Sequence, residues 1–158
     1  MINAGDGLHA HPTQALLDLF TVQEHLGSIE GLKVLIVGDV LHSRVARSAM
    51  WGFAKMGAIV TLSGPGTLLP LEFLRPNGHL PEGHCLASVK VDTNLDRAIV
   101  GADVVMALRL QSERQGSGYL PSMREYIRRW QVTESRLASA KPNALVMHPG
   151  PMNEGIEI

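Results

Sequence analysis

The chain has 158 residues, 45% of them hydrophobic, and its 14 Lys and Arg residues nearly balance its 15 Asp and Glu residues. This length fits one domain with one core. The near-neutral charge argues against nucleic-acid and membrane-surface binding, which need a basic excess. No apolar run approaches the roughly 18 residues that span a bilayer. One cysteine and no secretory signal predict a cytoplasmic protein without disulfides, and the scattered histidines predict no zinc site.

The first third of the chain predicts a loop, a helix, a strand and a second helix. Residues 1–10 are rich in Gly, Asp and His. Pro12 suits the first position of a helix, which puts His11 at the N-cap, and Gly27 is a stop signal. Apolar residues at 15, 19, 22 and 26 predict the buried face. Residues 33–37 predict a buried strand, and residues 43–56 predict a helix whose inward residues are Val45, Ala49, Phe53 and Met56.

The rest of the chain continues to alternate strands with helices. Strands are expected at 58–62, 86–91, 103–107 and 144–147, and helices at 123–130 and 134–140, the latter capped by Thr133. Residues 63–84 predict an irregular stretch with one helical turn near Leu71, and 108–122 a polar loop. Thr93 and Asp96 resemble a capping box that starts a short helix ended by Gly101. The pattern predicts a Rossmann-like, three-layer α/β/α fold with a parallel sheet of about four to five strands.

Polar side chains fall at the ends of the predicted strands, where ligands of such sheets bind. Arg44 follows the strand at 33–37 through a glycine turn, and Arg109 follows the strand at 103–107. Two guanidinium forks at one sheet edge suit a small dianion such as a dicarboxylate, because each fork binds a carboxylate in a bidentate way. A surface ion pair is the alternative for each arginine. Gln111 faces the same way if the backbone there stays extended.

His11 and Gln14 lie at a helix start, one turn apart. A neutral histidine there can donate a hydrogen bond to an oxygen that gains charge in a transition state, and a purely structural cap is the alternative. His148–Pro151 offers backbone carbonyls to an NH₂ group of a ligand, or serves only as a stiff chain exit. There is no G-x-S-x-G, and Gly38–Asp39 is not a G-x-G-x-x-G, so neither covalent nucleophilic catalysis nor dinucleotide binding is predicted.

Four motifs, in this order along the chain, resemble the aspartate carbamoyltransferase family. They are Asn3–Gly7 with His11–Asp18, Val37–Asp39 with His42–Ser48, Arg109–Gln111 with Glu113–Arg114, and Lys141–Pro142 with His148–Asn153. The resemblance implies transfer of the carbamoyl group of carbamoyl phosphate to the α-amine of L-aspartate, giving N-carbamoyl-L-aspartate and phosphate in pyrimidine biosynthesis. It implies no metal, no organic cofactor and no covalent enzyme intermediate, so catalysis would rest on positioning and electrostatic stabilisation.

The resemblance also implies a role for each matching residue. His11 would polarise the carbonyl oxygen of carbamoyl phosphate, and Arg44 is the second residue expected to act in catalysis. The NH₂ group of carbamoyl phosphate would be held by Gln14 and by the backbone carbonyls of Pro149 and Gly150. The aspartate carboxylates would be gripped by Arg44, Arg109 and Gln111. The loop at 110–122 resembles the family loop that closes over aspartate.

The resemblance makes residues 1–158 the second, aspartate-binding domain of the family. The first domain, with its S-T-R-T-R phosphate-binding segment, and the closing helix have no counterpart. We therefore expect the chain alone to be inactive, and to expose apolar surface that favours self-association. Glu154 departs from the arginine usual at that place. Family catalytic chains form trimers, so a homo-oligomer is expected, and a regulatory or dihydroorotase partner is left open.

Two other interpretations stay open. An ornithine-type or other amino-acid carbamoyltransferase would share this domain. The ornithine enzymes, however, typically carry H-C-L-P where this chain has His148–Pro151, and an S-M-G segment in place of Arg109 and Gln111. The third interpretation is a non-catalytic domain that binds aspartate or assembles with partners. Rescue of turnover by a separately supplied first domain would distinguish it from an enzyme half.

Overall fold

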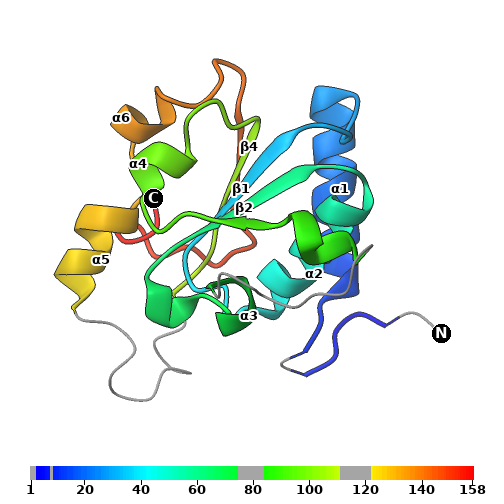
Figure 1. Cartoon of the computed structure of the whole chain (residues 1–158), viewed down its shortest axis with the longest axis horizontal. Coiled ribbons are helices and arrows are strands. Elements are labelled where there is room, and N and C mark those ends of the chain that lie inside the picture. Colours follow the sequence, from blue (N-terminus) through cyan, green and yellow to red (C-terminus); the bar gives the residue numbers. More distant parts are fainter. Residues whose placement is uncertain (1–2, 8, 75–83, 111–121) are drawn as a thin grey trace.

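Five parallel strands form a central sheet in the order β3-β2-β1-β4-β5, in a computed structural model that describes residues 3–7, 9–74, 84–110 and 122–158 (Figure 1). The strands are β1 (Lys33–Val37), β2 (Ile59–Ser63), β3 (Lys90–Val91), β4 (Val104–Ala107) and β5 (Leu145–Met147). Helices cover both faces, as a parallel sheet requires. The predicted three-layer α/β/α architecture is confirmed, with five strands.

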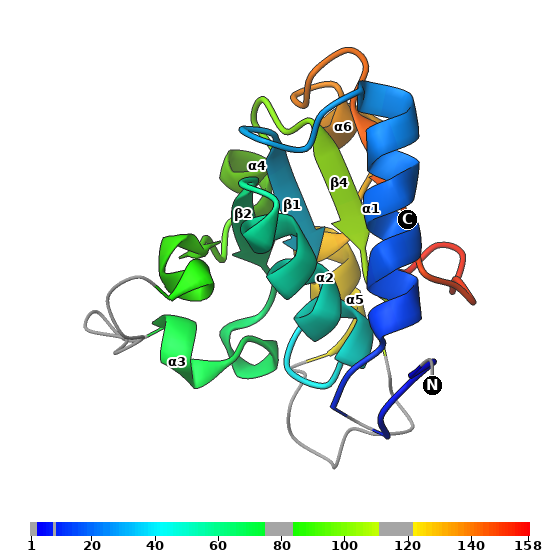
Figure 2. The same ribbon diagram turned by 90° about the vertical axis from the view of Figure 1, so that its right-hand side faces the viewer.

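Two layers of helices enclose the sheet (Figure 2). The longer helices, α1 (Pro12–Leu26) and α2 (Arg44–Lys55), pack side by side on one face. The other face carries the shorter helices α4 (Leu95–Ala98), α5 (Met123–Trp130) and α6 (Glu134–Leu137). A short α3 (Leu71–Leu74) and 3₁₀ turns at Gly66–Leu68 and Cys85–Ser88 complete the described elements.

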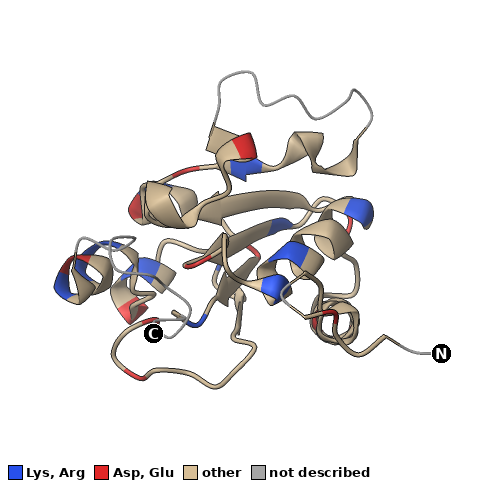
Figure 3. Ribbon diagram, turned by 90° about the horizontal axis from the view of Figure 1, so that it is seen from below, with Lys and Arg blue, Asp and Glu red and all other residues tan. Residues whose placement is uncertain are grey.

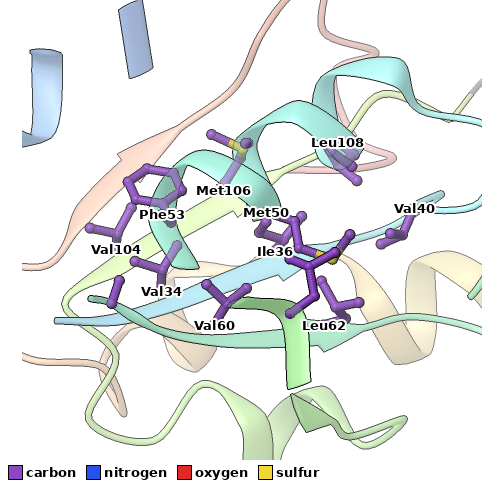
Figure 4. Packing of buried hydrophobic residues seen from close by; sticks show 14 of the residues in the cluster. Val34, Ile36, Val40, Met50, Phe53, Val60, Leu62, Val104, Met106 and Leu108 are labelled. Atoms are coloured by element: carbon purple, nitrogen blue, oxygen red, sulfur yellow. The ribbon is translucent and has the colours of Figure 1, made fainter. Parts of the chain in front are cut away.

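The central strand β1 supplies both halves of the core. Val34 and Ile36 point toward α2, where they meet Met50 and Phe53 (Figure 4). The intervening residues of β1 point to the opposite face and join the cluster under α4 and α5. This alternation follows from the two-residue period of a strand. Buried on both faces, β1 is a rigid base for the chain segment that leaves its carboxyl end.

The first helix matches its prediction, whereas α2 turns a different face inward. His11 caps α1 and Gly27 ends it with φ +77°. In α2 the buried residues are Ala46, Ala49, Met50 and Phe53. The prediction that Val45 and Met56 face inward was wrong. Both lie roughly 70–90° around the helix axis from the buried residues, and the Met56 side chain is 49% exposed.

Two expectations in the middle of the chain are corrected. The first half of the stretch expected as a strand at 86–91 is a 3₁₀ turn, because the His84 side chain accepts from Leu86 N and turns the backbone. β3 then pairs only with the end of β2. Asn94, rather than Thr93, caps α4 by accepting from Arg97 N, because the Asp92 carboxylate accepts the Asn94 N–H and sets the turn there.

Candidate functional site

The carboxyl ends of β1, β4 and β5 share one edge of the molecule with the starts of α1 and α2 (Figure 2). Val37 pairs with Ala107, and Met106 pairs with Met147, so the segments that follow these three strands leave the sheet side by side. Figure 3 views this edge from below and shows basic positions on α2 and α5. The sequence-predicted site residues in the described part of the chain all lie on segments that start or end here.

Two glycines shape the turn after β1. Gly38 has φ +123°, and a Cβ there would lie 3.0 Å from the Tyr126 hydroxyl oxygen and 3.1 Å from the Leu108 carbonyl oxygen. A Cβ on Gly64, at the end of β2, would lie 2.6 Å from the Gly38 carbonyl oxygen. Neither position has room for a side chain, because a neighbouring segment of the chain lies close to each glycine. Both positions therefore require glycine.

A buried carboxylate holds this turn. Asp39 is fully buried, and its Oδ1 accepts from the backbone N of His42 at 3.1 Å and lies 2.9 Å from His42 Nδ1. Ser43 then caps α2 by accepting from Ala46 N at 3.1 Å. Arg44 is therefore the first residue of α2, at the positive end of the helix. The sequence analysis gave Asp39 no such role, although an acid directly after a buried strand and a glycine is a usable signal.

The Arg44 guanidinium turns toward the amino-terminal segment. It donates to the Gly7 carbonyl oxygen at 3.0 Å and lies against Gly5. Among the described residues Arg44 makes no ion pair with an acid, so the surface ion pair considered from the sequence is not formed there. Most of its hydrogen-bonding capacity remains for a ligand, since a guanidinium has five N–H donors.

His11 is confirmed at the N-cap of α1, and its environment fixes its tautomer. Nδ1 accepts from the backbone N of Gln14 at 3.3 Å, so the proton of the neutral ring is on Nε2. The backbone N of His11 donates to Ser48 Oγ in α2 at 2.8 Å. This bond ties the starts of α1 and α2 together, and it brings His11 and Arg44 to the same corner of the edge.

Gln14 is held by an acid one turn further along α1. Its Nε2 donates to Asp18 Oδ1 at 2.9 Å. Asp18 is only 4% exposed. Burial raises the pKa of Asp18 to about 6, against a smaller lowering by the Gln14 hydrogen bond. The sequence analysis noticed Asp18 only as part of a motif, yet an acid on the buried stripe of an amphipathic helix is a signal in itself.

Beyond β4, a second buried acid fixes the backbone beside Arg109. Glu157 is 1% exposed; its Oε1 accepts from Leu110 N at 2.8 Å, and both oxygens accept from Asn153 at 2.8 Å. Arg109 itself is half-buried. The predicted partner Gln111 lies outside the described residues. No periodic pattern marks Glu157, because its main contact is 47 residues away in the sequence.

The exit from β5 presents two carbonyl groups. His148 Nδ1 accepts from Gly150 N at 2.9 Å, and burial lowers the pKa of His148, against an opposing effect of Glu157. This holds the loop with Gly150 at φ +65°. Within the described part of the chain, no N–H or O–H group donates to the carbonyl oxygens of Pro149 and Gly150. Both carbonyls are available to a donor on a ligand.

The edge is an open half-site rather than an enclosed pocket. Two hollows on the described surface lie away from this edge, between α4, α5 and α6, where the lining includes Asp96, Arg128 and Arg136. In residues 3–7, 9–74, 84–110 and 122–158, no three His, Cys, Asp or Glu side chains form a group that could hold a metal ion. No helix in those ranges is long and apolar enough to cross a bilayer.

Comparison with known proteins gives one consistent family. The sequence pattern of the aspartate/ornithine carbamoyltransferase Asp/Orn-binding domain matches residues 30–158. The aspartate carbamoyltransferase catalytic subunit of Roseiflexus castenholzii is 58% identical over all of this chain and 48% of the relative. That of Moorella thermoacetica is 55% identical over all of this chain and 48% of the relative. The chain thus spans about half the length of these curated relatives.

Solved structures agree. Aspartate transcarbamoylase from Trypanosoma cruzi, in complex with carbamoyl phosphate and aspartate, is 29% identical with a TM-score of 0.76, over 97% of this chain and 49% of that one. Ornithine carbamoyltransferase from Pyrococcus furiosus is 31% identical with a TM-score of 0.77, over 94% of this chain and 47% of that one. The fold of this chain is therefore about equally similar to the folds of the aspartate and ornithine enzymes.

Proposed function

The chain belongs to the aspartate/ornithine carbamoyltransferase family, and from this we propose that it is the aspartate-binding half of an aspartate carbamoyltransferase. The reaction joins the α-amine of L-aspartate to the carbamoyl carbon of carbamoyl phosphate, as a step of pyrimidine biosynthesis. The amine nitrogen attacks that carbon, the bond from carbon to the bridging oxygen breaks, phosphate leaves, and the amine loses a proton. We assign no cofactor to this step.

One observation supports the proposal most: the His11–Ser48 hydrogen bond ties the N-cap of α1 to α2, the helix that Arg44 begins. The Nε2–H of His11 is the donor that would stabilise negative charge on the carbamoyl oxygen as the tetrahedral intermediate forms. Gln14 and the carbonyls of Pro149 and Gly150 would hold the carbamoyl NH₂ group. Removing one donor of this kind from an active site costs about 3 kcal/mol of transition-state stabilisation.

The aspartate carboxylates would be held by arginines from two strand exits. Arg44 begins α2 after β1, and Arg109 follows β4, the strand that pairs with β1. Two guanidinium groups from neighbouring strands fit two carboxylates of one small ligand. We assign Gln111 to the same ligand from its place in the motif. The motif at 109–111 favours aspartate over ornithine, and the 58% identical relative carries the aspartate name.

We also propose that catalysis needs more than these residues. The open half-site contributes contacts to aspartate and to the carbamoyl group, and the phosphate contacts would come from a first, carbamoyl-phosphate-binding domain. With residues 1–158 as one domain, the active unit would be this domain joined to that one, in a cytoplasmic homo-oligomer. Lost phosphate contacts would remove most transition-state binding, so we propose that the chain alone is inactive.

The test supplies the remaining half of the Roseiflexus castenholzii relative as a separate protein. We expect carbamoylation of L-aspartate by the mixture and none by either part, followed as release of phosphate. Arg109→Ala should abolish turnover, and Arg124→Ala, an exposed arginine on α5, is the matched control. Turnover with L-ornithine instead would identify the sister enzyme. Binding of aspartate without turnover in any mixture would favour a non-catalytic domain.

A further inference from the structure

Asp18 is a buried acid whose second oxygen has no partner. Oδ1 accepts from Gln14 Nε2 at 2.9 Å. Among the described residues, Oδ2 is buried and accepts no hydrogen bond. A buried carboxylate with one hydrogen bond is unfavourable, because most of its hydration is lost and only partly replaced. A hydrophobic residue would suit this helix face better for stability alone, so the acid calls for another explanation.

The hydrogen bond fixes which end of the Gln14 amide faces outward. An ionised carboxylate only accepts hydrogen bonds, so it must face the NH₂ end of the amide and leave the carbonyl end turned away. In the described part of the chain the Gln14 carbonyl oxygen accepts no hydrogen bond. That oxygen is the correct partner for an NH₂ group on a ligand, whereas the NH₂ end of Gln14 would repel it.

We propose that Asp18 is a positioning residue that orients the Gln14 amide so that its carbonyl oxygen accepts from the carbamoyl NH₂ group. The proposal rests on the proposed function for the identity of the ligand. It adds that Asp18 acts only while ionised. A protonated Asp18 can donate to the Gln14 carbonyl oxygen, and the amide then turns its NH₂ end outward.

The other titratable and charged groups at this edge of the molecule have partners other than the Gln14 side-chain amide. At the N-cap of α1, His11 Nδ1 accepts from Gln14 N. On α2, Arg44 and Arg47 donate to backbone carbonyls of residues 7 and 9. At the end of β5, His148 responds to burial and to Glu157. None of them contributes to the raised pKa of Asp18, which comes from burial.

The first experiment uses the chain by itself. The side-chain amide signals of Gln14 are followed by ¹⁵N–¹H NMR from pH 5 to pH 8. We expect them to titrate with a midpoint near the Asp18 pKa of about 6. The titration should vanish in Asp18→Asn and persist in Glu24→Gln, a matched change at an exposed acid of the same helix. A titration unchanged by Asp18→Asn overturns the proposal.

The second experiment compares two ligands in the mixture with the Roseiflexus half. Carbamoyl phosphate has an NH₂ group on its carbonyl carbon, whereas acetyl phosphate has a CH₃ group in the same place and cannot donate there. Asp18→Leu removes the acceptor and should weaken carbamoyl phosphate about tenfold, as expected for one lost hydrogen bond. The affinity for acetyl phosphate should stay within about twofold of that of the parent chain.

The outcomes separate the two proposals. If Asp18→Leu weakens the binding of both ligands equally, Asp18 has only a structural role and the positioning role is overturned. Unchanged binding of carbamoyl phosphate by this variant also overturns it. Failure of the parent mixture to bind either ligand overturns the proposed function instead. In that case the NMR titration alone decides whether Asp18 orients Gln14. Partial retention of carbamoyl phosphate binding by Asp18→Asn, without pH dependence, supports orientation by an acceptor at position 18.

Discussion

Glu157 accepts the backbone N–H of Leu110 at 2.8 Å and so joins the end of the described chain to the segment that carries Arg109. Both Glu157 oxygens also accept from Asn153. Glu157→Ala would leave three N–H donors without their partner, at a cost of about 1–3 kcal/mol for each one that stays buried. We expect a lower melting temperature, and weaker binding of succinate because the Arg109 backbone is released.

Thermal unfolding and calorimetric titration with succinate measure the two effects of Glu157→Ala. Glu154→Ala is the matched control, because Glu154 is an exposed acid in the same segment. We expect the free energy of unfolding of the control to lie within about 0.5 kcal/mol of that of the parent chain, as is usual for exposed positions. Equal melting temperatures for the two variants would refute the role of Glu157 in holding Leu110.

The close approach of Gly64 to Gly38 gives a second prediction. A Cβ at position 64 would lie 2.6 Å from the Gly38 carbonyl oxygen, so Gly64→Ala forces the ends of β1 and β2 apart. We expect a loss of unfolding free energy of about 1–3 kcal/mol, as for other overpacked sites. Gly66→Ala is the control, since a Cβ there meets nothing within 4 Å. Urea unfolding measures both, and equal midpoints would contradict the argument.

The third prediction concerns the shape of the Arg44 guanidinium group. Arg44→Lys keeps the positive charge but replaces a planar fork by a single ammonium group, which cannot bind a carboxylate in a bidentate way. We expect succinate binding to weaken at least tenfold, roughly the value of one charge-assisted hydrogen bond. Arg97→Lys, at an exposed arginine paired with Asp92, is the control. Calorimetry that gives the same affinity for both variants would remove Arg44 from the site.

Local signals predicted the elements, and tertiary contacts supplied what the sequence analysis missed. Pro12 and Gly27 bound α1 because helix ends depend on neighbouring residues. The bond from Glu157 to Leu110, in contrast, spans 47 residues, and no spacing rule reaches that far. The resemblance named His11, Gln14 and the arginines. It did not show that buried acids at 18, 39 and 157 hold the segments that carry them.

The raised pKa of Asp18 predicts how stability depends on pH. The native state binds the Asp18 proton up to about pH 6, and the unfolded chain releases it at its ordinary value of 3.8. Stability from this group therefore falls as pH rises from about 4 to 6. Asp18→Asn removes this pH-dependent loss of stability. The melting temperature of the variant minus that of the parent chain should therefore increase between pH 4 and pH 7. Scanning calorimetry measures the difference, and a constant difference across this range would contradict it.

The exposed apolar stripe on α1 gives the last prediction. Leu16, Leu17 and Phe20 are 65%, 56% and 62% exposed, on the helix face opposite the buried stripe of Ala15 and Val22. Such contiguous apolar surface favours association. We expect the chain to self-associate at rising concentration, and Phe20→Ser to reduce the association. Leu71→Ser is the matched control, because Leu71 is 64% exposed on α3, away from the stripe. Light scattering compares them: equal loss of association in both variants would mean that general surface hydrophobicity, rather than α1, drives it.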